Sequence, residues 1–251
     1  MDIAKIAALL DPFLEQSLPP SELDQISIYI DLLLRWNTRI NLTAIRHPEE
    51  IVTRHFGESF FLARHLFPTQ PCHPDPELVE GEGPAGVPGS TAYRVLGTGH
   101  CTPRVLDIGS GAGFPALPLK MWAPQIHLTM VESNHKKAAF LREVTRALTL
   151  TDVNVITDRA EILAARPDSP RAEVVTLRAV ERFETILPQA AMFLAPNATL
   201  AMLIGIAQVP KLTTLTTLQW HPPILIPQSQ VRVLSIGVHM KSGTINSGKH
   251  T

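Results

Sequence analysis

An aspartate followed by alternate glycines is the stretch of this sequence best suited to chemistry. Asp107 precedes three glycines that are separated only by a serine and an alanine. The glycines are Gly109, Gly111 and Gly113. Side chains this small allow the backbone to turn sharply and let a ligand approach the main chain. The apolar run at 105–108 predicts a buried strand before the loop, so we expect strand, loop and following helix to form a nucleotide-facing corner.

The spacing of the glycines indicates which nucleotide cofactor the loop binds. The dinucleotide fingerprint G-x-G-x-x-G would require glycine at position 114, which is Phe114. Asp107 at the first strand end can reach toward an amine-bearing ligand. Glu132 ends a second apolar run at 127–132, where a βαβ unit holds a ribose hydroxyl pair. These features together favour S-adenosylmethionine over NAD.

The elements that must position these residues alternate between strand and helix. Strands are predicted at 105–108, 127–132, 153–156, 174–177, 198–204 and 231–239. Helices are predicted at 135–148, 160–165 and 183–194, with a poorer one near 209–218, and one directly after the glycine loop that holds Pro115 and Pro118 in its first turn. This alternation predicts a doubly wound α/β domain over residues 104–240.

A helical module is predicted at residues 1–67. Its first helix is expected at 2–16, and its second runs from a capping box of Ser21 and Asp24 to about Trp36. Residues 37–46 are expected to be irregular and held by Asn and Thr side chains. A third helix is predicted from His47 to about Leu66.

Two segments break this pattern. Residues 68–103 are dense in Pro, Gly, Ser and Thr, which predicts a disordered or loosely packed insertion. The polar tail at 241–251 is expected to fray. Cys72–His73 and His100–Cys101 bracket the insertion, but neither pair has the spacing of a zinc site, so we expect no metal.

Composition narrows the class of protein. The chain has 251 residues, of which 45% are hydrophobic, and a formal net charge of −1, so no global basic field draws it to nucleic acid. Two cysteines are too few for a disulfide-rich scaffold. The early acids argue against a signal peptide, and no apolar run reaches 18 residues, which together predict a cytoplasmic protein with no membrane partner.

Three further signals also allow a purely structural interpretation. Lys136, Lys137, Arg142 and Arg146 follow one predicted helix and form either a solvated face or a phosphate-binding stripe. His55 in isolation reads as a core histidine. Arg178 ends a strand at the ligand-binding edge of the sheet, although a charge closing an apolar run is commonly a surface residue.

Four stretches resemble the bacterial 16S rRNA guanine-N7 methyltransferases, the RsmG or glucose-inhibited division protein B family. They are WNTRINLTAIRHPEEIVTRHFGES, VLDIGSGAGFPALPLK, VESNHKKAAFLREV and VVTLRAV, in the family's order. The resemblance implies a class I methyltransferase fold and S-adenosylmethionine as methyl donor. It implies guanine N7 of 16S rRNA, in bare RNA or in the small ribosomal subunit, as acceptor. We expect a monomer.

The resemblance also implies site residues. Family cofactor contacts fall on Gly109, Phe114, Ala160, Glu161 and Arg178, in addition to Asp107, Gly111, Gly113 and Glu132 from the loop argument. The substrate side falls on Asn41, Thr43, Arg54 and His55, which are expected to position rather than to exchange protons. Ile204 stands where the family commonly has lysine, and Glu58 where it has aspartate.

Two other functions remain open at this point. A small-molecule methyltransferase with a helical lid would need no basic stripe at Lys136–Arg146. A degenerate protein that binds cofactor or rRNA without turnover is suggested by Ile204 and by the insertion. Methyl transfer to RNA, to metabolites or to neither would distinguish them.

Overall fold

The computed structural model describes residues 1–68, 102–178 and 183–239. The expectations for the insertion at 68–103 and for the tail at 241–251 fall almost wholly outside these residues.

The N-terminal region is helical, as predicted, but its boundaries differ. Its helices are α1 (Ile3–Leu10), the 3-10 turn η1 (Asp11–Phe13), α2 (Pro20–Asn37), α3 (Pro48–Glu50), η2 (Ile51–Gly57) and α4 (Glu58–Leu66). The first helix therefore ends earlier than expected. The capping box is wrong: α2 begins at Pro20 with Pro19 as its N-cap and no side-chain cap, which leaves Ser21 inside the first turn. The fixed φ of proline suits the start of a helix without such a cap.

The third predicted helix is continuous from Pro48 to Leu66, but its middle, η2, is a π-helix. A π-helix has wider turns than an α-helix, and such segments occur frequently at functional sites. This segment carries Arg54 and His55, two of the predicted substrate-side residues.

The glycine loop and the strands follow the predicted order. The strands are β1 (Arg104–Ile108), β2 (His127–Val131), β3 (Val153–Ile156), β4 (Ala172–Arg178), β5 (Leu194–Gly205), β6 (Leu218–Trp220), β7 (Ile224–Leu225) and β8 (Arg232–His239). They form one sheet in the order β3-β2-β1-β4-β5-β8-β6, with β7 beside β8. Strands β1 to β5 are parallel, whereas β8 is antiparallel to β5. The short strands β6 and β7 were not predicted, because too few residues alternate there to reveal a period.

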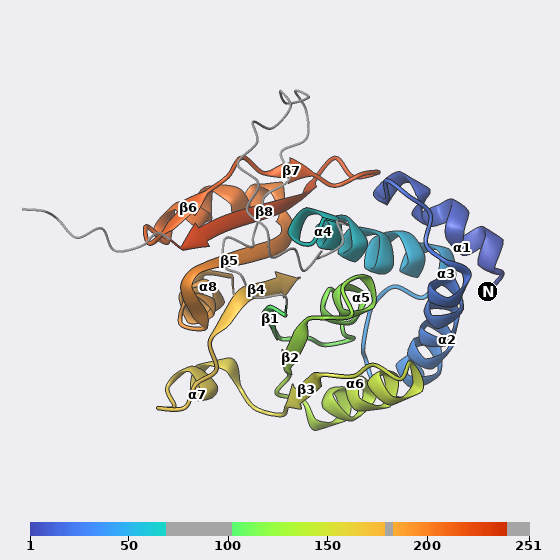
Figure 1. The fold of residues 1–251 in the computed structure, drawn as a ribbon, viewed down its shortest axis with the longest axis horizontal. Coiled ribbons are helices and arrows are strands. Elements are labelled where there is room, and N and C mark those ends of the chain that lie inside the picture. The colour runs from blue at the N-terminus through green and yellow to red at the C-terminus, as the bar shows by residue number, and fades with distance from the viewer. Residues whose placement is uncertain (69–101, 179–182, 240–251) are drawn as a thin grey trace, which may run out of the picture.

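Helices cover both faces of the sheet (Figure 1). These are α5 (Ala116–Trp122), α6 (His135–Ala147), α7 (Ala160–Ala164), α8 (Phe183–Ala191) and the 3-10 segment η3 (Ile206–Thr214). Alternate strand residues point to opposite faces. Val105 and its neighbours pack with α2, α4, α5 and α6, whereas Leu106 and its neighbours pack with α7, α8 and η3. The doubly wound fold is confirmed, and the N-terminal helices share the first of these two cores.

Among the described residues, no helix has the length and apolar character needed to cross a bilayer. No group of three histidine, cysteine, aspartate or glutamate side chains in the described part of the chain is arranged to hold a metal ion.

Candidate cofactor and substrate site

The glycine loop presents its main chain at the carboxyl edge of the sheet. Gly109, Gly111 and Gly113 all have positive φ, at 68°, 55° and 86°. A Cβ on Gly109 would meet no atom within 4 Å, and one on Gly111 would meet only the Gly109 carbonyl oxygen at 3.7 Å. A Cβ on Gly113 would collide with Tyr29 and Leu117. The first two glycines therefore border open space, while the third is needed for packing.

Glu132 fastens this loop to the start of α6. Its Oε2 accepts a hydrogen bond from Gly111 N at 2.8 Å, and its Oε1 accepts one from Asn134 N at 2.7 Å. Asn134 in turn caps α6 through its side chain. Each carboxylate oxygen can accept further bonds, so Glu132 lies beside the open glycines with acceptor capacity left for a ribose hydroxyl.

Asp107 is buried, and only one of its two carboxylate oxygens has a hydrogen-bond partner among the described residues. Its Oδ1 accepts a hydrogen bond from Thr176 Oγ1 at 2.6 Å, whereas its buried Oδ2 has no hydrogen-bond partner among the described residues. Burial raises the pKa of this carboxyl to about 7. A buried acceptor without a partner, two residues before an open glycine, fits a cationic group such as the ammonium of S-adenosylmethionine.

Phe114 lies between two other rings. It stacks on Tyr29 with centroids 5.1 Å apart and on His55 with centroids 4.6 Å apart, and the interplanar angles are 8° and 16°. Both ring faces are thus covered, which leaves the ring edge and the backbone of Phe114 for contact with a cofactor. Tyr29 also donates a hydrogen bond to the Ala112 carbonyl of the loop. Our sequence reasoning missed Tyr29, whose only signal is a hydroxyl on the apolar face of α2.

The predicted pair Ala160 and Glu161 begins α7, directly after β3. Ala160 is buried, and Glu161 is exposed and pairs with Arg159 at 3.8 Å. Because β3 lies beside β2 in the sheet, this turn belongs to the same edge as Glu132.

His55, which is predicted to face the substrate, contacts both β4 and the loop before η2. Its Nδ1 lies 2.9 Å from Nη1 of Arg178, and its Nε2 lies 2.8 Å from Oγ1 of Thr43. Burial, followed by the charges of Arg178 and Arg54, holds the pKa of His55 well below its usual value. The structure therefore brings together Thr43, His55 and Arg178, which the sequence assigned to two different sites.

The loop before η2 is held by Asn37, one of the Asn and Thr side chains that were predicted to hold residues 37–46. Asn37 Oδ1 accepts hydrogen bonds from the backbone N–H of Leu42 and Thr43, and its Nδ2 donates to the Thr43 carbonyl. The expectation that an Asn side chain organises residues 37–46 is confirmed. Asn41 itself is exposed, and it places its side chain at the surface of this loop.

Glu58 is the second residue that the sequence reasoning undervalued. Its side chain is 2% exposed and forms ion pairs with Arg54, Arg178 and Arg232. Arg178, which is predicted to contact the cofactor, uses its Nη groups on Glu58, His55 and the Arg54 carbonyl. Its position in sequence, one helical turn beyond Arg54, was the available signal for Glu58.

The basic residues of the predicted stripe on α6 differ in their contacts. Arg142 donates from Nη2 to the Val155 carbonyl at 2.9 Å and to Thr157 Oγ1 at 2.8 Å, so it fastens α6 to β3. Lys136 is exposed at the start of the helix and has no such contact. Ile204 is 5% exposed and packs in the core beside Leu212 and Val233.

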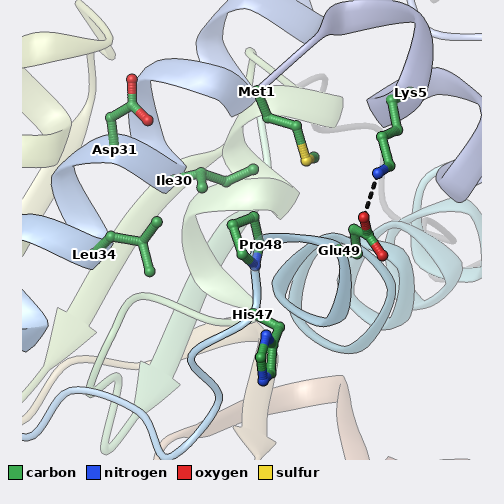
Figure 2. A pocket seen from close by; sticks show the side chains of 8 residues that line it. All are labelled: Met1, Lys5, Ile30, Asp31, Leu34, His47, Pro48 and Glu49. Carbon is green, nitrogen blue, oxygen red and sulfur yellow. Dashed lines mark hydrogen bonds and ion pairs between the residues drawn. The ribbon is translucent and has the colours of Figure 1, made fainter.

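A separate cavity of about 470 Å³ opens between α1, α2 and α3 (Figure 2). Met1, Ile30, Leu34 and Pro48 line it, and an ion pair between Lys5 and Glu49 crosses one side. None of the predicted cofactor or substrate residues lines this cavity.

The strand order, the open glycine loop after β1 and the acid after β2 define a Rossmann-like class I methyltransferase fold. A family model described as rRNA small subunit methyltransferase G (GidB) matches residues 22–75 and 93–218. The chain belongs to this family.

Named relatives agree with this assignment. Ribosomal RNA small subunit methyltransferase G of Roseiflexus castenholzii is 38% identical over 66% of this chain and 58% of the relative. The Bacillus subtilis protein of the same name is 32% identical over 68% of this chain and 59% of the relative. The protein of that name from Xylella fastidiosa strain 9a5c is 34% identical over 76% of each chain. The chain thus spans less than two thirds of the length of the first two of these relatives.

Among solved structures, TrmN from Thermus thermophilus is similar with a TM-score of 0.46 and 16% identity, over 55% of this chain and 45% of that one.

Proposed function

We propose that this protein transfers a methyl group from S-adenosylmethionine to guanine N7 in 16S rRNA of the small ribosomal subunit. The family assignment supports RNA as the acceptor. The orphaned Oδ2 of Asp107, beside the open backbone of Gly109 and Gly111, supports the cofactor. When bound, S-adenosylmethionine supplies an electrophilic methyl group on a sulfonium.

The state of His55 is the observation that carries the choice of acceptor atom. A guanidinium has only donors, so Nδ1 of His55 must accept from Arg178, and Nε2 then carries the proton and donates to Thr43. A histidine held in this way has no free lone pair with which to accept a proton. Guanine N7 has an available lone pair and no proton, so its methylation needs positioning rather than a base.

The other proposed roles follow from placement. Asp107, Glu132 and the turn at Ala160–Glu161 would hold the cofactor along β1, β2 and β3, with Gly109, Gly111 and the Phe114 edge against it. Asn41, Thr43, Arg54 and His55 would orient the RNA. The target guanine would be an unpaired loop nucleotide, because such a base can be unstacked at low cost. The protein would act as a monomer on ribosomal particles in the cytoplasm.

The test is methyl transfer from labelled S-adenosylmethionine to bare 16S rRNA, to 30S subunits from a strain lacking the modification, and to a metabolite mixture. We expect one N7-methylguanine in the RNA. Transfer to metabolites alone would establish the small-molecule alternative. Cofactor binding without any transfer would establish a binding protein, the alternative that the buried Ile204, in place of the family's lysine, favours.

A further inference from the structure

Three guanidinium groups converge on the one buried carboxylate of Glu58. Arg232 Nε lies 2.6 Å and Arg54 Nε 3.3 Å from Oε1, and Arg178 Nη2 lies 3.0 Å from Oε2. Arg54 also reaches Glu50 at 3.5 Å, whose side chain is 44% exposed. In this cluster of described residues, three cations therefore face two carboxylates, and one positive charge remains in excess.

The excess charge is accompanied by free donors. Arg178 uses its Nη groups within the protein, as described above. Among the described residues, both Nη groups of Arg232 and Nη2 of Arg54 have no hydrogen-bond or ion-pair partner. These two side chains are 26% and 37% exposed, so a ligand can reach them. The planar fork of arginine matches the geometry of an oxyanion.

The cluster lies at the ligand-binding edge of the sheet. Arg178 at the end of β4 pairs with Leu203 of β5, and Gly205 at the end of β5 pairs with Arg232 of β8. Strand β4 is the neighbour of β1, which leads into the glycine loop. Arg232 also lies beyond residues 22–75 and 93–218, which the family model matches.

We propose that Arg54 and Arg232 form a subsite for an oxyanion, and that this oxyanion is a backbone phosphate of the RNA substrate. The inference rests on the proposed function. The alternative source is the carboxylate of the cofactor, whose ammonium group we place at Asp107. Asp107 on β1 and Arg232 on β8 are separated by three strand spacings, or about 14 Å at ~4.8 Å each. This separation of the two strand backbones favours the RNA phosphate, and the cofactor titration below distinguishes the two sources.

The test compares Arg232→Gln with Arg104→Gln. The first variant leaves Glu58 paired with two arginines, so it should fold. Arg104 pairs with Glu173 at the opposite edge of the sheet, so its substitution removes the same charge far from the subsite. Binding of 16S rRNA and of 30S subunits is measured from 50 to 300 mM KCl, with calorimetry for S-adenosylmethionine and thermal melting for folding.

Loss of one phosphate contact should reduce the slope of log Kd against log salt by about 0.7 to 0.9 in Arg232→Gln only. Cofactor affinity should not change. Arg232→Lys, which keeps the charge, should keep the slope. If the glutamine variant melts early, Arg54→Gln serves in its place, because it removes the other donor of the subsite and should lower the slope in the same way. A wild-type slope in folded Arg232→Gln would overturn the subsite, as would a loss of cofactor affinity. A wild-type protein that binds neither RNA would overturn the proposed function itself.

Discussion

Nη1 of Arg178 lies 2.9 Å from Nδ1 of His55, although the two residues are 123 positions apart in the chain. This contact fixes the imidazole as the neutral tautomer with its proton on Nε2. Glu58 holds the same guanidinium through Nη2, so Arg178 joins β4 to both His55 and Glu58.

The rate of methyl transfer should be independent of pH. The lowered pKa keeps His55 neutral throughout the neutral range, and guanine N7 needs no base. Single-turnover rates at saturating cofactor and RNA should be flat between about pH 6 and 9. A log-linear rise of unit slope, abolished by one carboxylate or histidine substitution that leaves both affinities intact, would contradict this mechanism. It would point instead to an acceptor that loses a proton.

Cofactor affinity, in contrast, should depend on pH through Asp107. A cation requires the ionised carboxylate, and its pKa is about 7 in the folded protein. As the pH rises toward 7, affinity for S-adenosylmethionine should increase by up to about tenfold per pH unit, and binding should release a proton. Above about pH 7 the affinity should level off. Calorimetry at pH 6.3 in two buffers of different ionisation enthalpy measures the proton. Asp107→Asn should bind weakly and without this dependence.

The same carboxyl should affect stability with a defined sign. Its pKa is raised above the ordinary value of 3.8, so between these values the folded protein without cofactor binds more protons than the unfolded chain. The free energy of unfolding should therefore fall as the pH rises from about 4 to 7. Denaturant titrations of the wild type and of Asp107→Asn measure the difference. Equal slopes would show that Asp107 does not titrate in this range.

Gly111→Val should abolish cofactor binding. The valine would need a positive φ, at a cost of about 1 to 2 kcal/mol in stability, and its side chain would fill the open space that a ligand needs. Gly205→Ala is the control, since Gly205 has φ of −75° and no atom closer than 3.7 Å to its added Cβ. Calorimetry and thermal melting separate the two effects. Unchanged affinity in Gly111→Val would defeat the cofactor assignment.

The basic residues of α6 should have different effects. Lys136→Gln with Lys137→Gln should flatten the salt dependence of RNA binding without lowering the melting temperature. Arg142→Gln should instead reduce stability by about 1 kcal/mol, because it loses its bonds to β3. An unchanged salt slope in the lysine variant would show that these lysines belong to a solvated helix face and do not contact RNA phosphates.

Removal of residues 76–92, which the family model leaves unmatched, should leave both melting temperature and methyl transfer near the wild-type level. The segment is rich in Pro and Gly and offers few apolar groups to bury, so little stability should depend on it. A large fall in melting temperature after excision would show that the segment packs.

The sequence by itself determined the glycine loop, the strands that lead to it and most helix positions. These features depend on neighbouring residues: apolar periodicity, small side chains in a turn and prolines near helix starts. It also determined that an Asn side chain would hold residues 37–46. It did not reveal the π-helical turn of η2, because the wider winding of that segment changes no residue pattern that a single sequence displays.

Only the tertiary structure decided which of these residues meet. The sequence did not show that Phe114 lies between Tyr29 and His55. It also did not show that Glu58 forms ion pairs with arginines from η2, β4 and β8. The antiparallel placement of β8 beside β5 brings Arg232 to the same edge as Arg178. Such contacts depend on the order and direction of strands far apart in the chain. The position of a charged residue in the sequence therefore does not predict which distant residue it contacts in the folded protein.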